Sequence, residues 1–302
     1  MSTSKILDII CDAKENTIVT LVTHAGKFHA DDVMSTAILT LLLQKVGIKN
    51  IRQVRTYNPA EEGYTDDTPN CIVYDIGLGQ YDHHQVGDAA KHCIRLDDDG
   101  VERKYAACGL IWKEIGAQFV GSEKHAKIIY DSILRYIDDQ DNGFGHNPLS
   151  TMLGYMNPNM ISPPESYYKS DFENAVYIAR TMFIATLEHF KLLKEFENCF
   201  QKYVEESDGS CLVTPTYMPG ADEICREHEI PFYVYPNQRK EGSYCFKTIN
   251  TDPQDNNTHL CDIPDEVRNW EGVNFLHPSC FMGAADSKER AVEICRILVD
   301  RN

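Results

Sequence analysis

The sequence contains no pair of cysteines in the spacing Cys-x-x-Cys, although it has 11 cysteines. This absence excludes zinc ribbons and thioredoxin-type redox motifs. An odd number of scattered cysteines instead predicts reduced, mostly buried thiols in a reducing compartment. A long apolar segment is missing as well: the longest apolar stretch, residues 37–43, is far shorter than the about 20 residues that span a bilayer. We therefore expect no membrane partner.

Basic residues are scarce in this sequence. Lysine and arginine total 29 against 46 aspartates and glutamates, which gives a formal net charge of −17. This balance argues against a protein that coats long duplexes through charge alone, because non-specific affinity comes from basic contacts to phosphates. Nucleotides and short oligonucleotides stay open as partners, since bound metal ions supply positive charge locally. A hydrophobic content of 42% and a charged content of 25% exclude collagen and disorder.

The start of the sequence shows no signal-peptide pattern. Asp8, Asp12 and Glu15 argue against an acid-poor transit peptide. We expect an intracellular protein, in the cytoplasm first, with the nucleus and the mitochondrion as open alternatives. The sequence does not indicate an oligomeric state.

The first half of the chain alternates buried strands with helices. Strands are predicted at residues 17–23, 51–57 and 71–76, and helices after a cap at Asp31 or Asp32, at 105–119 and at 122–141. This alternation predicts an α/β domain with a parallel sheet. We divide the chain into a domain at 1–165, a helical connector at 166–206 and a smaller α+β domain at 207–302.

The later segments are less regular. Residues 147–168 read as an irregular connection, and 171–206 as one or two long helices. Short strands are predicted at 211–214, 231–235 and 243–250, with a final helix at 287–300.

Histidines and acids gather where the first and third predicted strands end. Ligands bind beyond the carboxyl ends of parallel strands, so both groups can converge on one crevice. The candidates at these two strand ends are His24, His29, Asp31, Asp75, Asp82, His83 and His84.

The helix that ends before Asn142 adds two more acids. Asp138 and Asp141 continue the apolar stripe of Leu134 and Ile137, whereas Asp139 points elsewhere. A carboxylate on the inward side of a helix needs a partner, and a metal ion supplies one.

Imidazole and carboxylate groups without a thiolate suit Mn²⁺, Fe²⁺ or Mg²⁺ better than a structural zinc. The candidates are too many for a single ion. Two ions about 3.5–4 Å apart, bridged by a carboxylate, would use them and would suit phosphoester hydrolysis. We expect two Mn²⁺ ions, with Mg²⁺ as the alternative.

Each candidate also has an ordinary structural interpretation. His24 or His29 alone is a hydrogen-bonded loop residue, and Asp31 or Asp32 alone is a helix cap. Asp138 and Asp141 alone form a solvated helix end. The metal site is favoured by the joint pattern, above all by the adjacent histidines that follow Asp82, which have little structural purpose.

Several motifs resemble the melanocyte-proliferating-gene (MYG-type) exonuclease family of the DHH phosphoesterase superfamily. They are THAGKFHADD at 23–32, YDHHQ at 81–85 and YIDDQDNG at 136–143, with further similar segments at 105–113 and 277–283. The resemblance implies a DHH-type catalytic domain, a C-terminal substrate-binding domain, a manganese-type site and 3′–5′ exonuclease action on RNA.

The resemblance also implies roles for individual residues. His84 would contact the phosphate, and we place Asp82 beside it as a catalytic candidate. His277 and Gly283 would contact the substrate. The implied metal ligands are His24, His29, Asp31, Asp75 and His83, with Asp138 as the acid of the fourth motif and Asp141 as a further candidate.

We therefore predict a metal-dependent phosphodiester hydrolase that acts on RNA or a short oligonucleotide. A pyrophosphatase or nucleotide phosphatase on the same fold is the alternative that the negative charge and the missing ladder of stacking aromatics favour. A non-catalytic metal-binding regulatory protein is a third possibility, although such a protein would be expected to have lost ligands. The sequence does not decide between Asp138 and Asp141 as the direct ligand.

Overall fold

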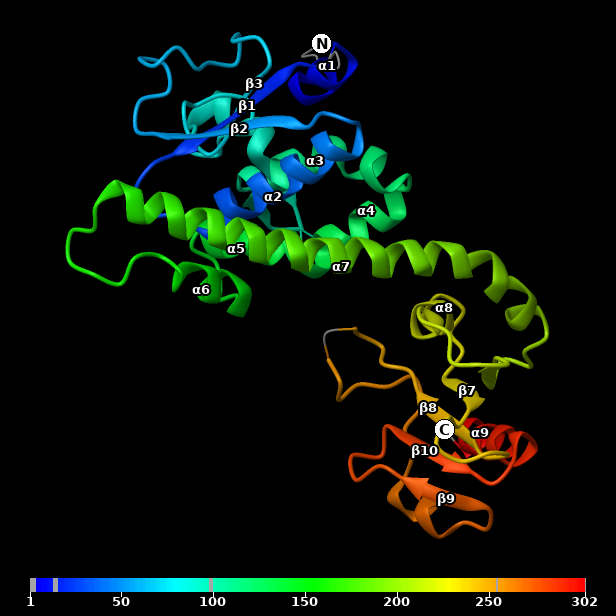
Figure 1. Cartoon of the computed structure of the whole chain (residues 1–302). Helices are drawn as coiled ribbons and strands as arrows, with labels where there is room; N and C mark the ends of the chain where they lie inside the picture. The colour runs from blue at the N-terminus through cyan, green and yellow to red at the C-terminus, as the bar shows by residue number, and fades with distance from the viewer. Residues whose placement is uncertain (1–3, 13–15, 98–99, 254, 302) are drawn as a thin grey trace. The chain divides into compact units, whose positions relative to one another are not determined.

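The computed structural model describes residues 4–12, 16–97, 100–253 and 255–301. It divides into two compact units, Met1–Glu188 and His189–Asn302 (Figure 1). The division falls inside the segment 166–206 that the sequence analysis treats as a connector. The long helix α7 (Glu165–Glu205) covers most of that segment and contributes residues to both units.

The first unit contains a three-stranded parallel sheet in the order β2-β1-β3. Strand β1 (Ile18–His24) lies in the middle, between β2 (Asn50–Thr56) and β3 (Cys71–Val73). Val19, Leu21, Val22 and Thr23 are buried, which suits a central strand. The structure thus confirms the predicted α/β fold with a parallel sheet.

Strand β3 is shorter than the predicted 71–76. After Val73 the chain leaves the ladder, and Asp75 adopts a left-handed backbone conformation with φ 55°. Aspartate is one of the few residues besides glycine that tolerates this region. The turn places the Asp75 carboxylate beyond the strand end.

Helix α2 (Ala30–Lys45) is buried on all sides from Ala30 to Leu39. It contacts β1 as well as α3 (Ala107–Val120), α5 (Arg135–Asp141) and α6 (Pro148–Gly154). The predicted cap at Asp31 or Asp32 is wrong, because the residue before the helix is His29. Asp32 lies one turn inside and accepts a hydrogen bond from the His29 N–H at 2.8 Å. Both acids therefore lie in the first turn, where the helix dipole favours negative charge.

The predicted helix at 122–141 consists of three consecutive parts. Helix α4 (Glu123–Ile129) begins at Ser122, whose hydroxyl accepts a hydrogen bond from the His125 N–H. A π-helical turn, η2 (Tyr130–Leu134), then leads into α5. Wide turns of this kind insert a residue and rotate all later side chains, and they occur often at functional sites.

The prediction of an irregular connection at 147–168 is wrong in part. It contains α6 and the start of α7, which is one helix that begins at Glu165. The remaining elements of this unit are α1 (Lys5–Asp12), the 3₁₀ turn η1 (Gly87–Cys93) and the antiparallel pair β4 (Ile94–Leu96) and β5 (Glu102–Lys104). Among the described residues, no helix has both the length and the apolar character that crossing a membrane requires.

The second unit contains a five-stranded sheet in the order β6-β7-β8-β10-β9. Its strands are β6 (Cys211–Val213), β7 (Phe232–Pro236), β8 (Tyr244–Thr248), β9 (Val273–Leu276) and β10 (Met282–Ala285). Helices α8 (Ala221–Glu227) and α9 (Lys288–Arg301) and the 3₁₀ turn η3 (Asp265–Asn269) complete it. The sequence analysis missed β9, β10 and α8, each of which is shorter than eight residues.

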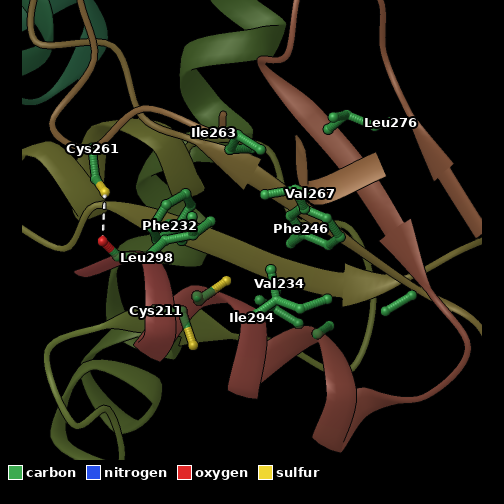
Figure 2. Close-up of a cluster of buried hydrophobic side chains, with 13 residues drawn as sticks. Cys211, Phe232, Val234, Phe246, Cys261, Ile263, Val267, Leu276, Ile294 and Leu298 are labelled. Atoms are coloured by element: carbon green, nitrogen blue, oxygen red, sulfur yellow. Dashed lines mark hydrogen bonds between the residues drawn. The ribbon is translucent and has the colours of Figure 1, made fainter. Parts of the chain in front are cut away.

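One hydrophobic core joins the sheet of the second unit to α9. Phe232, Val234 and Phe246 point from the strands toward Ile294 and Leu298 of the helix (Figure 2). The Cys261 thiol of a neighbouring loop donates to the Leu298 carbonyl at 3.6 Å. All the described cysteines are free thiols, and most of them are buried, as the scattered pattern predicted.

Candidate metal centre

The centre of the site is the carboxylate of Asp75. One of its oxygens, Oδ2, lies 3.2 Å from His24 Nε2 at the end of β1. The other, Oδ1, lies 3.3 Å from His83 Nε2. Parallel strands bring both partners to the same sheet edge, so the segments around residues 24 and 75 meet there although they are far apart in sequence.

A second acid approaches His24 from the first turn of α2. His24 Nε2 lies 3.3 Å from Asp32 Oδ2, and the Asp32 side chain is fully buried. The ligand atoms of His24, Asp32 and Asp75 lie within 4.8 Å of one another, close enough to surround one ion.

Two further groups of possible ligands surround His83. Its Nε2 lies 3.1 Å from Asp141 Oδ2 at the end of α5, and Asp141 Oδ1 lies 3.8 Å from His29 Nδ1. Two sets of ligand atoms lie within 4.8 Å of one another here, namely Asp31, His83 and Asp141, and Asp75, His83 and His84. Asp75 thus belongs both to a group that contains His24 and to a group that contains His83.

The loop after Asp75 is folded back so that the Asp-His-His triplet lies beside it. The Asp75 N–H donates to the Tyr81 carbonyl at 3.0 Å. Asp82 then closes the loop, because its Oδ2 accepts from the Leu78 N–H at 2.7 Å and its Oδ1 accepts from the His84 N–H at 3.0 Å. The same Oδ1 lies 2.7 Å from His84 Nδ1. Both oxygens of Asp82 are therefore engaged in positioning the loop and His84.

Asp138 contacts different partners from Asp141, although both lie on α5. Its oxygens accept from the Tyr130 hydroxyl at 2.7 Å and from the Gly109 N–H at 3.2 Å, and the Cys108 thiol lies 3.4 Å away. Tyr130 belongs to the π-turn, so this irregular turn holds the acid of the following helix. Asp138 faces the start of α3, whereas Asp141 faces the histidines.

Asp31 connects these two regions. Its carboxylate accepts from the backbone N–H groups of Ala107 at 3.1 Å and Cys108 at 2.7 Å, in the first turn of α3. These N–H groups have no partner within their own helix, and they stabilise a negative charge. Asp31 also shares a group of possible ligands with Cys108 and Asp138, all three of them buried.

The buried acids draw protons onto their surroundings. Burial alone would lower the pKa of His83, but the carboxylates of Asp141 and Asp75 outweigh it and raise the pKa to about 11. The same opposition raises the pKa of His24 to about 9. Burial raises the pKa of Asp32 to about 7, although His24 opposes this shift. The carboxylates around His83 and His24 thus favour positive charge between them, and a bound cation is one source of such charge.

These residues fit divalent cations. The buried atoms Asp32 Oδ2, Asp75 Oδ1 and His83 Nε2 make no hydrogen bond to any described residue, although they lie within ion-pair distance of one another or of His24. Buried polar atoms are normally paired, so a set of unpaired atoms that converge needs a common partner. Oxygen and imidazole donors without thiolate suit Mn²⁺ or Mg²⁺.

Arg55 lies behind the site and was not a candidate in the sequence analysis. Its Nη2 donates to the Gly26 carbonyl at 2.9 Å and lies 3.9 Å from Asp32 Oδ2. The guanidinium also stacks on the Phe172 ring of α7, 4.3 Å from its centre. Arg55 therefore ties the loop after β1 to α7. The sequence feature that could have identified Arg55 is its position near the end of a predicted parallel strand.

The sequence analysis missed Asp32 as well as Arg55. Asp32 is a possible metal ligand, but it was considered only as a helix cap. The structure brings together His24, His29, Asp31, Asp75, His83, His84 and Asp141, with Asp82 beneath them. It places Asp138 at the start of α3, in contact with the Asp31 group.

His277 and Gly283 belong to the second unit. The His277 ring contacts the Phe281 ring in a tilted arrangement, 4.4 Å between ring centres, and its Nδ1 accepts from the Ser279 N–H at 3.1 Å. Gly283 pairs with Phe246 across β10 and β8, and a Cβ at this position would overlap the Phe246 ring. Packing thus provides a reason for this glycine that is independent of any substrate.

Taken together, the fold and the site define an α/β protein with a candidate divalent-metal centre. The MYG1 exonuclease family model, described as an uncharacterised protein family (UPF0160), matches residues 20–299. The chain belongs to this family, which confirms the resemblance predicted from its motifs.

Curated relatives match along almost their whole length. A MYG1 protein of Dictyostelium discoideum is 22% identical, covering 91% of this chain and 94% of its own. A MYG1 exonuclease of Rattus norvegicus is 22% identical, covering 91% and 83%. A MYG1 protein of Schizosaccharomyces pombe is also 22% identical, covering 94% and 98%. Among solved structures, RecJ of Thermus thermophilus with Mg²⁺ gives a TM-score of 0.24 at 10% identity, covering all of this chain and 52% of RecJ.

Proposed function

We propose that the protein is a metal-dependent phosphodiester hydrolase that degrades RNA or short oligonucleotides as an exonuclease, from the 3′ end. The observation that carries this proposal is Asp75, whose two carboxylate oxygens face two different groups of buried ligands. A carboxylate in this position suits a bridge between two cations. The name of the rat relative, an exonuclease, supports the same class of reaction.

The geometry favours a division of the ligands into two groups. His24 and Asp32 would hold one cation together with Asp75. His83 and Asp141 would hold the other, with Asp75 shared between the two. Asp31 belongs to the second group with His83 and Asp141, and His29 lies beside that group, 3.8 Å from Asp141. Mn²⁺ is the cation that we propose, with Mg²⁺ as the weaker alternative.

Bound cations would polarise the scissile phosphate and lower the pKa of the attacking water. His84 would supply a contact to the phosphate, because 58% of its side chain is exposed. The hydrogen bond from His84 Nδ1 to Asp82 raises the pKa of His84, although burial opposes the shift. A protonated His84 would stabilise the negative charge that develops on the phosphate oxygens. Asp82 acts through His84 and is a positioning residue.

The second unit offers a surface that could hold the remainder of the substrate. A hollow of ≈ 840 Å³ is lined by Arg226, Lys247, Tyr217 and Phe281, among others. The Arg226 Nε donates to the Asn250 carbonyl at 3.0 Å, which fixes the guanidinium at the wall. Lys247 forms an ion pair with Asp222 of the same wall, so Arg226 and the aromatic side chains are the groups that would suit a phosphate and bases.

A small-substrate phosphohydrolase remains the second candidate function, favoured by the formal charge of −17. The decisive experiment compares RNA of several lengths, labelled at either end, with pyrophosphate and a nucleoside bisphosphate. Each substrate is assayed with Mn²⁺, with Mg²⁺ and with a chelator, and Asp75→Asn serves as the inactive control. An exonuclease produces metal-dependent shortening of RNA from one end. Rapid hydrolysis of pyrophosphate with intact RNA would establish the alternative.

A further inference from the structure

A pocket of ≈ 460 Å³ lies beside the metal centre in the first unit. Its volume is within the about 300–1,000 Å³ that small-molecule pockets occupy. His29, Asp31 and Asp141 form the part of its wall that belongs to the metal centre. The rest of the wall is formed by Lys27, Phe28, Ile137, His146, Ser150 and Tyr155, with their neighbours.

Ser150 provides an independent sign that this pocket takes a ligand. The residue is only 7% exposed, and its hydroxyl makes no hydrogen bond to any described residue. Buried hydroxyl groups are nearly always paired, because an unpaired one loses its bonds to water without replacement. Ser150 lines the pocket, so a polar group of an occupant can supply the missing partner.

The remaining wall suits one particular kind of occupant. The Tyr155 ring is 82% exposed, which leaves a free aromatic face at the pocket. Such a face can stack on any base. Lys27 is exposed at the wall and carries a positive charge, while Phe28 and Ile137 add apolar surface. These groups match the parts of a nucleotide. The hydroxyl suits the sugar, the aromatic face suits the base, and the cationic group beside the metal centre suits the phosphate.

We propose that this pocket holds the terminal nucleoside of the oligonucleotide during cleavage. The Ser150 hydroxyl bonds a hydroxyl of the terminal sugar, Tyr155 stacks on the terminal base, and Lys27 faces the phosphate. This inference rests on the proposed nuclease function and deepens it, because a pocket for a single terminal nucleoside would direct cleavage to an end and would release mononucleotides.

The first test is direct binding without catalysis. Uridine and adenosine are titrated into chelator-treated protein and followed by nuclear magnetic resonance. Nucleosides carry no phosphate, so they test the pocket independently of the metal centre. We expect Tyr155→Ala to weaken binding about tenfold, in line with the loss of one stacked base. Tyr177→Ala, a matched control on α7 with a 71% exposed ring outside the pocket, should bind as the wild type does.

Ser150→Ala tests the sugar contact. It should weaken uridine binding several-fold but should leave the weaker binding of 2′,3′-dideoxyuridine unaltered, since that ligand lacks both hydroxyls. This pattern also separates a lost hydrogen bond from a general disturbance, which would weaken both ligands equally. Three results would overturn the proposal. The first is that wild type, Tyr155→Ala and Ser150→Ala bind uridine with equal affinity. The others are equal weakening of both ligands in Ser150→Ala and no nucleoside binding at all.

The second test compares two phosphodiesters in the metal-loaded enzyme. Bis(p-nitrophenyl) phosphate has a scissile phosphate but no nucleoside, whereas RNA has both. Tyr155→Ala should raise KM for RNA about tenfold more than KM for bis(p-nitrophenyl) phosphate. An equal effect on both substrates would contradict the nucleoside pocket. If the wild type hydrolyses neither substrate, the proposed nuclease function fails, and the nucleoside titration still decides what the pocket binds.

Discussion

Asp75 Oδ1 lies 3.3 Å from His83 Nε2, and neither of these two buried atoms makes a hydrogen bond to a described residue. Two buried polar atoms that face one another without bonding are expected where both are oriented toward a shared third partner. Asp75 reaches this position through a left-handed backbone conformation, φ 55°, which is uncommon for residues other than glycine. Strain of this kind is found at functional sites, where the surrounding structure maintains it.

Replacement of Asp75 tests whether the two groups of ligands depend on one carboxylate. Asp75→Asn keeps the shape of the side chain but removes its charge, so we expect the content of bound Mn²⁺ and the hydrolysis rate to fall together. Metal content by mass spectrometry and turnover on the same sample are the measurements. Asp67→Asn, an exposed acid outside the site, is the control and should retain both. Full activity of chelated wild-type protein would contradict a metal-dependent mechanism.

His83 and His84 are adjacent but should behave differently. His83 is buried between Asp75 and Asp141, so His83→Ala should lower metal content and rate together. His84 is bonded to Asp82 and more than half exposed, so His84→Ala should retain most of the metal and lose at least about tenfold in turnover. Calorimetric titration of Mn²⁺ into each variant distinguishes them. Equal loss of metal in both variants would show that His84 is a ligand.

Asp138 and Asp141 of α5 should also behave differently, Asp141 in metal binding and Asp138 in stability. Asp141→Asn should weaken metal binding with little change in melting temperature, because Asp141 faces His83 and His29. Asp138→Ala leaves the Tyr130 hydroxyl and the Gly109 N–H without their acceptor, so the free energy of unfolding should fall by about 1–3 kcal/mol for each group. Urea unfolding and metal titration on both variants check this. A stable Asp138→Ala variant that has lost its metal would reverse the two assignments.

The ionisation of Asp138 should make its contribution to stability depend on pH. Burial raises its pKa from 3.8 to about 7, although the Tyr130 hydroxyl opposes the shift. A carboxyl group with a raised pKa in the folded state stabilises that state in its neutral form, and this contribution is lost as pH rises from about 4 to about 7. The neutral variant Asp138→Asn has no such loss.

The difference in unfolding free energy between wild type and Asp138→Asn should therefore shift in favour of the variant as pH rises from about 4 to about 7. Urea unfolding in the presence of a chelator measures it without interference from bound metal. A difference that is constant across this range would show that Asp138 ionises as freely in the folded protein as in the unfolded chain.

The segment from His277 to Gly283 allows a separate test of substrate contact. Gly283→Ala should lower the melting temperature, because the new methyl group overlaps the buried Phe246 ring. His277→Ala should lower turnover on RNA more than stability if the proposed substrate contact is correct. Melting temperature and turnover are measured on the same samples. A His277→Ala variant that melts earlier but keeps its turnover would make His277 a packing residue beside Phe281.

The sequence by itself determined the parallel α/β architecture of the first unit. Val19, Leu21 and Val22 belong to a largely apolar run, which is typical of a strand that is buried on both faces. Strands of this kind usually occur in parallel sheets. It also predicted where the possible metal ligands gather, because residues that follow such strands share one edge of the sheet. The family followed from motifs that occupy that edge.

Short elements depended on partners that lie far away in the sequence. Strands β9 and β10 have four residues each, and their pattern of side chains is too short to show a period. They exist because β10 pairs with β8, where Gly283 lies opposite Phe246. Only the tertiary structure provides such partners.

The tertiary structure alone decided which partners each acid of the pairs Asp31/Asp32 and Asp138/Asp141 contacts. Neighbouring residues on a helix point about 100° apart, so Asp31 and Asp32 face different partners, the start of α3 and His24 respectively. On the other helix, the π-turn at Tyr130–Leu134 rotates the later residues by an amount that no regular repeat predicts. Asp138 contacts Gly109 of α3 and Asp141 contacts His83, because packing sets which elements each position of the helix meets.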